Sequence, residues 1–217
     1  MKQAVLTKKV KHLETTEISV KLFIFLFVFL PFSLWAHQGQ QVFKLCAACH
    51  GPHGEGKPDI EVPQIAGLPS WYVKKQLVKF KKGVRGKHPQ DIAGMRMAPM
   101  ARTLKDKDIE VVAEYVASLK PSSHKEEVSG DKANGQAKFA TCMACHGPKA
   151  QGNQAIGAPP LVHLDAWYIK KQIKNFQKGI RGRDASKDPE GAQMAPMAAT
   201  LSGDKDIQDV IFYIKSL

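Results

Sequence analysis

Two short segments of this 217-residue chain share one arrangement of cysteine and histidine. In each segment two cysteines stand three positions apart and a histidine follows directly: Cys46, Cys49 and His50, then Cys142, Cys145 and His146. Two thiols at this spacing can each add to one vinyl group of the same porphyrin, and the histidine then lies under the iron as its proximal ligand. The pattern therefore predicts two covalently attached c-type haems, with the four cysteines as attachment points and the two histidines as iron ligands.

Other uses of such cysteines are a zinc site, a redox-active dithiol or a disulfide. All four cysteines of the chain belong to the two motifs, so none is left over. A zinc site would need two further ligands at short spacing, and none follows either motif. A thioredoxin-like dithiol would not require a histidine directly after it in both places. These considerations favour covalent haem.

The first 36 residues have the pattern of an export signal. Residues 1–21 carry five lysines against two glutamates, and residues 22–36 form an uncharged, largely apolar stretch. A basic region followed by an apolar region of this length is typical of a signal peptide, and it is short for a membrane-spanning helix. We expect cleavage after Ala36, although Leu34 is large for its position before the cleavage site. The alternative is an uncleaved leader that anchors the protein to the membrane. Both place the rest of the chain in the periplasm, where bacteria attach c-type haem.

The remainder of the chain is an internal repeat, in which segments of the first copy recur 96 to 98 residues later. The matched segments are Gly39–Phe43 with Gly135–Phe139, Trp71–Gln76 with Trp167–Gln172, Lys82–Gly86 with Lys178–Gly182, Met97–Met100 with Met194–Met197, and Asp106–Ile109 with Asp204–Ile207. This predicts two copies of one domain, at residues 37–120 and 131–217. The polar, proline-bearing stretch 121–130 between them is a predicted linker.

The pattern of apolar residues predicts an all-α fold with about four helices per copy, because no segment alternates as a strand does. We expect a first helix at about 38–45, with the haem motif at its end, and its counterpart at about 132–140. A second helix should begin near Trp71 and stop at Gly83. A final helix should begin at Asp106 or Lys107, with its counterpart at 204–217. A core this small is marginal by itself, so each domain should be wrapped around its haem.

The iron of an electron-transfer haem usually takes a second protein ligand, and methionine opposite histidine raises its reduction potential. Such a ligand should lie well downstream of the haem motif, on a loop that returns over the other face of the haem. A Met-Ala-Pro-Met segment occupies this place in both copies and offers two candidates in each, Met97 or Met100 and Met194 or Met197. Because methionine is a common core residue, one of each pair is expected to be a packing residue.

Other methionines and histidines lack the symmetry of the repeat. Met95 and Met143 have no counterpart in the other copy, and neither do His53, His88 and His163. We therefore expect packing roles for the two methionines, and surface or packing positions for the three histidines.

Together, these motifs resemble those of the dihaem cytochromes c4, which are tandem class I cytochrome c domains of the bacterial periplasm. The shared motifs span nearly everything after the leader: C-x-x-C-H-G, Tyr-x-x-Lys-Gln followed by Leu or Ile, Lys-Gly-x-Arg-Gly, and the methionine segment before Asp-x-Asp-Ile. In that family the ligand methionine lies eight positions before the polar residue that opens the last segment, here Lys105 and Ser202. The resemblance therefore implies Met97 and Met194 as iron ligands and makes the second methionine of each segment a packing residue.

The resemblance also implies an activity, the carriage of single electrons between respiratory complexes, and no enzyme catalysis. The donor would be a quinol–cytochrome c oxidoreductase or a periplasmic dehydrogenase, and the acceptor a terminal haem–copper oxidase. One alternative is a dihaem electron-accepting subunit fixed to a periplasmic dehydrogenase. The other is a dihaem peroxidase, which needs an open coordination site or a ligand that leaves. The methionine segment in both copies argues against the peroxidase.

The net charge of +12 suggests acidic partners. Seven lysines and arginines lie within residues 74–87. This run is either a solvated helix face or a surface that docks on acidic proteins or on a membrane. Arg85 and Arg181, which occupy identical places in the repeat, are candidates to bind the haem propionates. The export signal and the haem motifs exclude nucleic acid as the partner, despite the charge.

Overall fold

The computed structural model describes residues 37–122 and 126–217, so the predicted signal peptide lies outside the described part of the chain. The chain divides into a short N-terminal unit that ends at Gln38 and a unit from Gly39 to Leu217, which holds both copies of the repeat. Within the described residues, no helix has the length and apolar character needed to cross a membrane.

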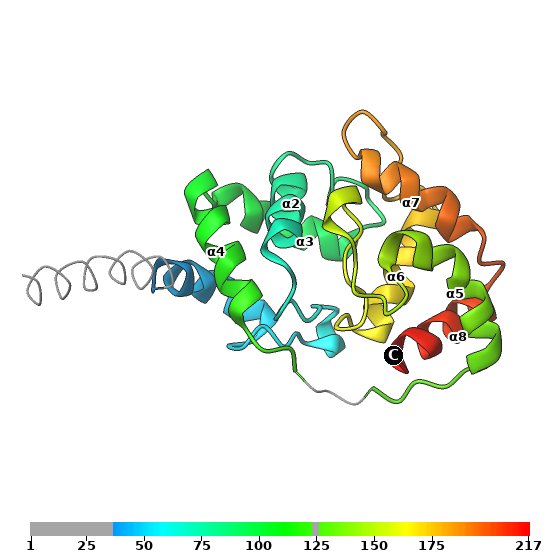
Figure 1. Cartoon of the computed structure of the whole chain (residues 1–217). Helices are drawn as coiled ribbons and strands as arrows, with labels where there is room; N and C mark the ends of the chain where they lie inside the picture. The colour runs from blue at the N-terminus through cyan, green and yellow to red at the C-terminus, as the bar shows by residue number, and fades with distance from the viewer. Residues whose placement is uncertain (1–36, 123–125) are drawn as a thin grey trace, which may run out of the picture. The chain divides into compact units, whose positions relative to one another are not determined.

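Each copy of the repeat is built from four α-helices and one short 3-10 helix (Figure 1). In the first copy, a helix that ends at His50 is followed by η1 (Pro58–Ile60), α2 (Ser70–Lys81), α3 (Ile92–Thr103) and α4 (Asp106–Ser118). In the second copy, the order is α5 (Lys132–His146), η2 (Gln154–Ile156), α6 (Ala166–Gln177), α7 (Pro189–Ala199) and α8 (Asp204–Lys215). The described residues contain two isolated β-bridges and no strand. The expected all-α class and number of helices are confirmed.

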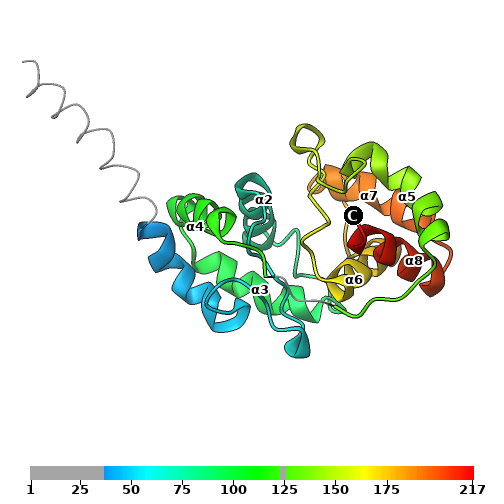
Figure 2. The ribbon, with the colours of Figure 1, turned by 60° about the horizontal axis from the view of Figure 1, so that its bottom comes forward.

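The helix that carries each haem motif crosses the last helix of its own copy. In the second copy, α5 lies against α8 in both views of the ribbon (Figures 1 and 2). Gly135 makes this close crossing feasible, because a Cβ atom at that position would lie 2.1 Å from the carbonyl oxygen of Asp209. Gly39 has the same role in the first copy, where a Cβ atom would lie 2.4 Å from the carbonyl oxygen of Val111. The two glycines that open the repeat are therefore explained by packing.

The haem-motif helices are longer than the sequence predicted. The helix in each copy continues through the cysteines to the histidine, and α5 ends at His146 with Gly147 as its C-cap. Gly147 has a φ of 79°, a left-handed value that favours glycine. Both cysteines of a motif thus lie within the final turns of a helix, where residues three apart share one face.

The Met-Ala-Pro-Met segments are helical, so the expected loop is wrong. Proline cannot donate a backbone hydrogen bond, yet Pro99 lies inside α3 and Pro196 inside α7. Each helix begins with an aspartate whose side chain accepts a hydrogen bond from a backbone amide, Asp91 from Gly94 N in α3 and Asp188 in the equivalent place of α7. This cap and the burial of small apolar residues such as Ala98 outweigh the lost hydrogen bond.

Two clusters of buried apolar side chains form the core. One, around Phe43, Ile109 and Val112, belongs to the first copy. The other, around Phe139 and Ile207, also includes side chains of the first copy, among them Tyr72. The two copies are therefore joined by continuous apolar packing.

Candidate functional site

Each predicted proximal histidine is buried and oriented by a backbone carbonyl. The Nδ1 atom of His50 lies 2.8 Å from the carbonyl oxygen of Pro63, and that of His146 lies 2.8 Å from the carbonyl oxygen of Pro159. A carbonyl only accepts, so Nδ1 carries the proton and Nε2 keeps its lone pair. Burial lowers the pKa of both imidazoles, although the carbonyl hydrogen bond opposes this. A neutral, oriented imidazole with a free Nε2 is what a metal ligand requires.

The four cysteines line two pockets, one in each copy of the repeat. The first cysteine of each motif is half-buried, whereas the second is exposed. Burial raises the pKa of Cys46 to about 11 and also raises that of Cys142, so both thiols are protonated at neutral pH before any attachment.

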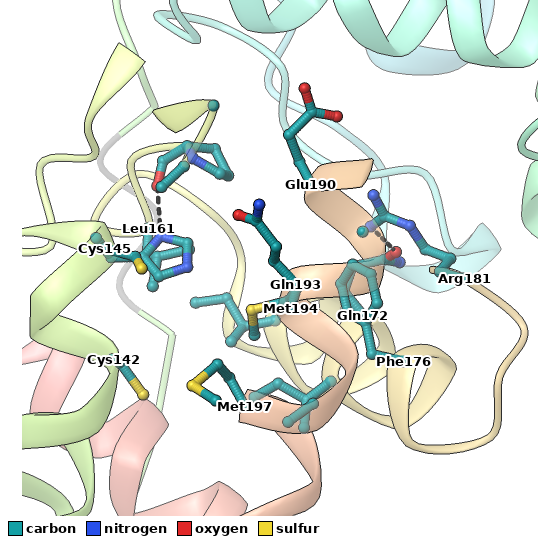
Figure 3. A pocket seen from close by; sticks show the side chains of 18 of the residues that line it. Cys142, Cys145, Leu161, Gln172, Phe176, Arg181, Glu190, Gln193, Met194 and Met197 are labelled. Atoms are coloured by element: carbon teal, nitrogen blue, oxygen red, sulfur yellow. Dashed lines mark hydrogen bonds between the residues drawn. The ribbon is translucent and has the colours of Figure 1, made fainter. Parts of the chain in front are cut away.

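The Met-Ala-Pro-Met segments of α3 and α7 face the same two pockets as the cysteines. All four candidates, Met97, Met100, Met194 and Met197, line a pocket. Figure 3 shows Met194 and Met197 on α7, across the pocket from Cys142 and Cys145 of α5. Met97 and Met194 also pack against the apolar cores, whereas Met100 and Met197 are 42% and 37% exposed. The first methionine of each pair is therefore the more deeply placed.

Two buried arginines lie where the pockets meet. Arg85 Nη1 donates to Gln76 Oε1 at 2.7 Å, and Arg181 Nη1 donates to Gln172 Oε1 at the same distance (Figure 3). Each guanidinium also stacks on a phenylalanine ring of its own copy, with its carbon 4.4 Å from the ring centre. Neither forms a salt bridge with a carboxylate within residues 37–122 and 126–217. Two charged groups are thus buried without a carboxylate in direct contact, although Asp91 attracts Arg85 and Asp188 attracts Arg181 at longer range.

The Nε atoms of both arginines are buried and lack a hydrogen-bond partner in the described part of the chain. Burial and the neighbouring charge of Arg85 lower the pKa of Arg181, so an anion beside the two groups would be stabilising. Unsatisfied buried donors of this kind are costly unless a ligand accepts from them. Haem propionates are carboxylates, so these atoms fit the group that the cysteine motifs predict.

The remaining lining of each pocket suits a porphyrin. Apolar side chains of the second helix of each copy contribute to the walls, Leu77 and Phe80 of α2 in the first pocket and Ile173 and Phe176 of α6 in the second. An imidazole and thioether sulfurs line each pocket, and donors of these kinds would suit a six-coordinate c-type haem. Within the described part of the chain, the residues of both pockets therefore fit a covalent haem.

The two pockets share part of their lining. Tyr72 and Gln76 of α2 and Tyr168 and Gln172 of α6 contribute to both pockets. Arg85 Nη2 reaches Gln172 Oε1 at 3.4 Å, which is a long hydrogen bond across the domain boundary. Groups bound in the two pockets would thus be separated by a single layer of side chains.

An ion-pair cluster beside the second pocket also joins the domains. Lys79 of α2 is bound to Asp188 and, at 3.0 Å, to Glu190 of α7. Lys75 lies 2.7 Å from Glu190. The first pocket has no equivalent, because Asn175 occupies the place of Lys79 in the repeat.

Some of the residues that orient the histidines and arginines, but that the sequence analysis did not name as site residues, could have been found from the repeat. Pro63 and Pro159 are equivalent in the repeat, and Gln76 and Gln172 belong to a matched segment. Lys79 gave no such signal, since its counterpart differs. The histidines and methionines expected to have packing or surface roles line neither pocket: His53, His88, His163, Met95 and Met143.

Comparison with known proteins agrees with this geometry. The family model described as Cytochrome c matches residues 36–120 and again residues 132–217. The chain belongs to the cytochrome c family. As a member with two such domains and two C-x-x-C-H motifs, it binds two haem c groups covalently.

The similar proteins include other dihaem cytochromes. Cytochrome c4 of Stutzerimonas stutzeri is 32% identical over 192 residues, which cover 84% of this chain and 89% of that protein. A thiosulfate dehydrogenase electron acceptor of Thiomonas intermedia is 33% identical over 152 residues, or 64% of this chain and 65% of that protein. The crystal structure of reduced recombinant cytochrome c4 from Pseudomonas stutzeri matches with a TM-score of 0.65 and 31% identity, and covers 84% of this chain and 98% of that structure.

These matches confirm the resemblance to cytochromes c4 and the tandem all-α architecture. They also show an electron-transfer cytochrome with two haems. The individual iron ligands and the exact domain boundaries remain predictions.

Proposed function

We propose that this dihaem cytochrome is an exported carrier that accepts single electrons from a respiratory donor and delivers them toward a terminal oxidase. The observation that carries the proposal is the matched set of side chains lining both pockets: an oriented imidazole and a partly buried methionine in each. When bound between such ligands, the haem supplies a reversible one-electron couple. Two closed coordination spheres favour electron transfer over chemistry on a bound substrate.

In this proposal, Cys46 and Cys49 hold the first haem and Cys142 and Cys145 the second. His50 and His146 are the proximal ligands, and the hydrogen bonds to the prolyl carbonyls fix their rings. Met97 and Met194 are the distal ligands. Their deeper placement in α3 and α7 supports this choice over Met100 and Met197.

Arg85 and Arg181 have a supporting role in the proposal. Their buried Nε–H groups would donate to propionate oxygens at the junction of the pockets. The same junction brings the two pockets against a shared layer of side chains, which suits electron exchange within the molecule. The domains would correspond to residues 37–120 and 131–217, joined by the linker 121–130.

The location that we propose is the periplasm, on the basis of the basic and apolar pattern of residues 1–36. Cleavage of this segment would release the protein, and retention would keep it at the membrane. The donor would be a quinol–cytochrome c oxidoreductase or a dehydrogenase.

The proposal is tested on the purified protein with both haems attached. We expect six-coordinate, low-spin spectra and the weak near-infrared band of methionine-ligated ferric haem at an intensity for two haems. The reduced protein should not bind carbon monoxide. Rapid binding of carbon monoxide or peroxide would show an accessible iron and would refute the carrier function in favour of a peroxidase.

The second candidate is the electron-accepting subunit of a dehydrogenase. The similarity to a thiosulfate dehydrogenase electron acceptor favours it. A stable complex with a dehydrogenase on purification, together with haem reduction that depends on thiosulfate, would support this function over a freely diffusing carrier.

A further inference from the structure

The peptide group between Pro63 and Gln64 is hydrogen-bonded on both sides, and the two bonds reach different domains. Its carbonyl oxygen, that of Pro63, lies 2.8 Å from Nδ1 of His50. Its amide, that of Gln64, donates to Oδ2 of Asp165 at 2.8 Å. His50 belongs to the first copy of the repeat, whereas Asp165, which is buried, belongs to the second. A carboxylate of one domain is therefore connected to the predicted proximal histidine of the other through a single peptide group.

The Gln64 side chain holds this peptide group in place. Gln64 is 5% exposed, and its Nε2 donates to the carbonyl oxygen of His163 at 2.8 Å. Its Oε1 accepts from the backbone amide of Ser122 at 2.7 Å. These bonds to two further segments restrict the rotation of the peptide group, so its amide stays directed at Asp165.

Asp165 directs its carboxylate at the first domain instead of at its own helix. It precedes α6 in the N-cap position, where an aspartate side chain usually accepts from the first amides of the helix. The Asp165 side chain caps no amide of α6. Glu126 has that role, since both of its carboxylate oxygens accept from the amide of Ala166, at 2.8 and 2.7 Å. The bond from Gln64 to Asp165 is therefore not a by-product of helix capping.

The second copy lacks this connection because of its sequence. The Nδ1 atom of His146 has the same contact with the carbonyl oxygen of Pro159, at 2.8 Å. The next residue is Pro160, which has no N–H group to donate. The repeat also places Pro69 at the position of Asp165, so the first copy has no matching carboxylate to offer. The connection is therefore specific to the histidine of the first copy.

The connection affects how basic the histidine is. A carboxylate that accepts from an amide polarises the peptide group and makes its carbonyl oxygen a stronger acceptor, because hydrogen bonds in a chain strengthen one another. A stronger acceptor draws the Nδ1 proton of His50 and makes the imidazole a more basic metal ligand. A more basic ligand stabilises ferric over ferrous iron, so the reduction potential falls.

We propose that Asp165 is a positioning residue for electron transfer: through the Pro63–Gln64 peptide group it strengthens the hydrogen bond of His50 and lowers the potential of the first haem. The proposal rests on the carrier function and on His50 as the proximal ligand. It deepens that function, because the contact with the second domain then sets the potential of the haem in the first. The second haem has only the unassisted carbonyl bond of His146.

The first test needs no variant. In the reduced, ¹⁵N-labelled protein with both haems attached, the ring Nδ1–H groups of His50 and His146 give separate proton signals. A stronger hydrogen bond moves such a signal downfield, so the signal of His50 should lie downfield of that of His146. Equal positions, or the reverse order, would overturn the proposal.

The second test is Asp165→Asn, which removes the charge and keeps an oxygen that can accept from Gln64. The Nδ1–H signal of His50 should move upfield, and that of His146 should stay in place. The equilibrium constant for reduction of the first haem should rise about three- to tenfold, or ~30–60 mV for one electron, and that of the second less than about twofold. A redox titration followed by the two signals measures both changes. A His50 signal that does not move would contradict the proposal.

Two controls separate the proposed connection from other effects of the same substitution. Asp91→Asn removes another buried carboxylate that lines the first pocket, and asparagine can still cap α3. Glu61→Gln removes a carboxylate of the same pocket together with an interdomain contact, its pair with Lys171 at 2.6 Å. Both should leave the Nδ1–H signal of His50 in place. A movement in either control as large as in Asp165→Asn would attribute the effect to charge or to the domain interface, and the proposal would fail.

The carrier function is tested separately on the same samples. Binding of carbon monoxide by the reduced wild type, or loss of its six-coordinate, low-spin spectrum, would refute the proposed function itself. A normal spectrum and a reversible titration, with a His50 signal that does not respond to Asp165→Asn, would refute only the role of Asp165. If Asp165→Asn does not fold, the comparison of His50 with His146 in the wild type decides.

Discussion

The replacement of Lys79 by glutamine tests how the two domains are held together. The Lys79 side chain is 10% exposed and reaches from α2 of the first domain to α7 of the second. There it is bound to Asp188, whose side chain is 4% exposed, and to Glu190 at 3.0 Å. Removal of the ammonium group leaves the Asp188 carboxylate buried, with the amide of Gly191 as a remaining donor.

The expected loss of stability follows from this burial. Breaking a buried ion pair by removing one partner costs about 3–5 kcal/mol. The lower end applies here, about 3 kcal/mol, because Glu190 is 29% exposed and keeps its bond to Lys75. With a denaturant slope of about 2–3 kcal/mol per molar urea, the unfolding midpoint should fall by ~1 M.

Urea unfolding of the haem-loaded protein, followed by far-ultraviolet circular dichroism, measures this effect. The control is Lys171→Gln, which removes an interdomain pair with Glu61, a residue that is 52% exposed. An exposed pair is worth about 0–1 kcal/mol, so this midpoint should move much less. The double variant Lys79→Gln/Asp188→Asn should recover most of the loss, since it removes the stranded charge and asparagine can still cap α7. The reasoning is refuted if Lys79→Gln costs no more than Lys171→Gln.

Four further predictions concern pH, ligation, potential and packing. Burial raises the pKa of Glu190, but hydrogen bonds from two lysines of α2 outweigh this and bring it to about 2. The stability that this depressed pKa contributes is complete above the ordinary value of 4.5 and is lost as the pH falls toward 2. Unfolding measured between pH 5 and 2 should therefore show a loss of stability that is smaller in Glu190→Gln. Met97→Leu should remove the near-infrared methionine band of one haem and lower its potential, whereas Met100→Leu should keep the band; the opposite result would exchange their roles. A redox titration should resolve two potentials, because the charges around the pockets differ although the ligands match, and a single shared potential would contradict this. Gly135→Ala should cost about 1–3 kcal/mol because it overpacks the crossing of α5 and α8, while Gly203→Ala, with nothing within 4 Å of the added Cβ atom, should cost less, about 0.5–1 kcal/mol, because alanine is a poorer N-cap of α8 than glycine.

The chemistry of the haem sites was predictable because it depends on short, covalently fixed spacings. Two cysteines and a histidine within five positions define the attachment motif wherever the chain folds. The repeat then indicated that the same arrangement occurs twice, and the family match confirmed two domains. Helix positions were also predictable from apolar periodicity, as α2 and α4 show.

The methionine segment was harder to predict because two local preferences compete there. A proline within a short apolar stretch indicates a loop, since it removes a backbone donor. The aspartate that caps each helix lies six residues before the first methionine of the segment, so the residue that favours the helix lies outside the Met-Ala-Pro-Met motif. Each segment holds two methionines, so residue type alone left two candidates for the iron ligand. The capped helix places both methionines of a pair toward the pocket, and only their different burial separates them.

The domain interface could not be predicted from the repeat, because it depends on residues in which the copies differ. Lys79 and Asp188 are 109 residues apart, and no periodicity connects them. At the place of Lys79, the second copy has Asn175, whose buried Nδ2 atom lacks a partner in the described part of the chain. The predicted ligand sets of the two haems are thus equal, whereas the charged residues beside the pockets differ. If the haems do differ in potential, the cause should therefore be sought in residues such as Lys79 and Asn175 and not in the iron ligands.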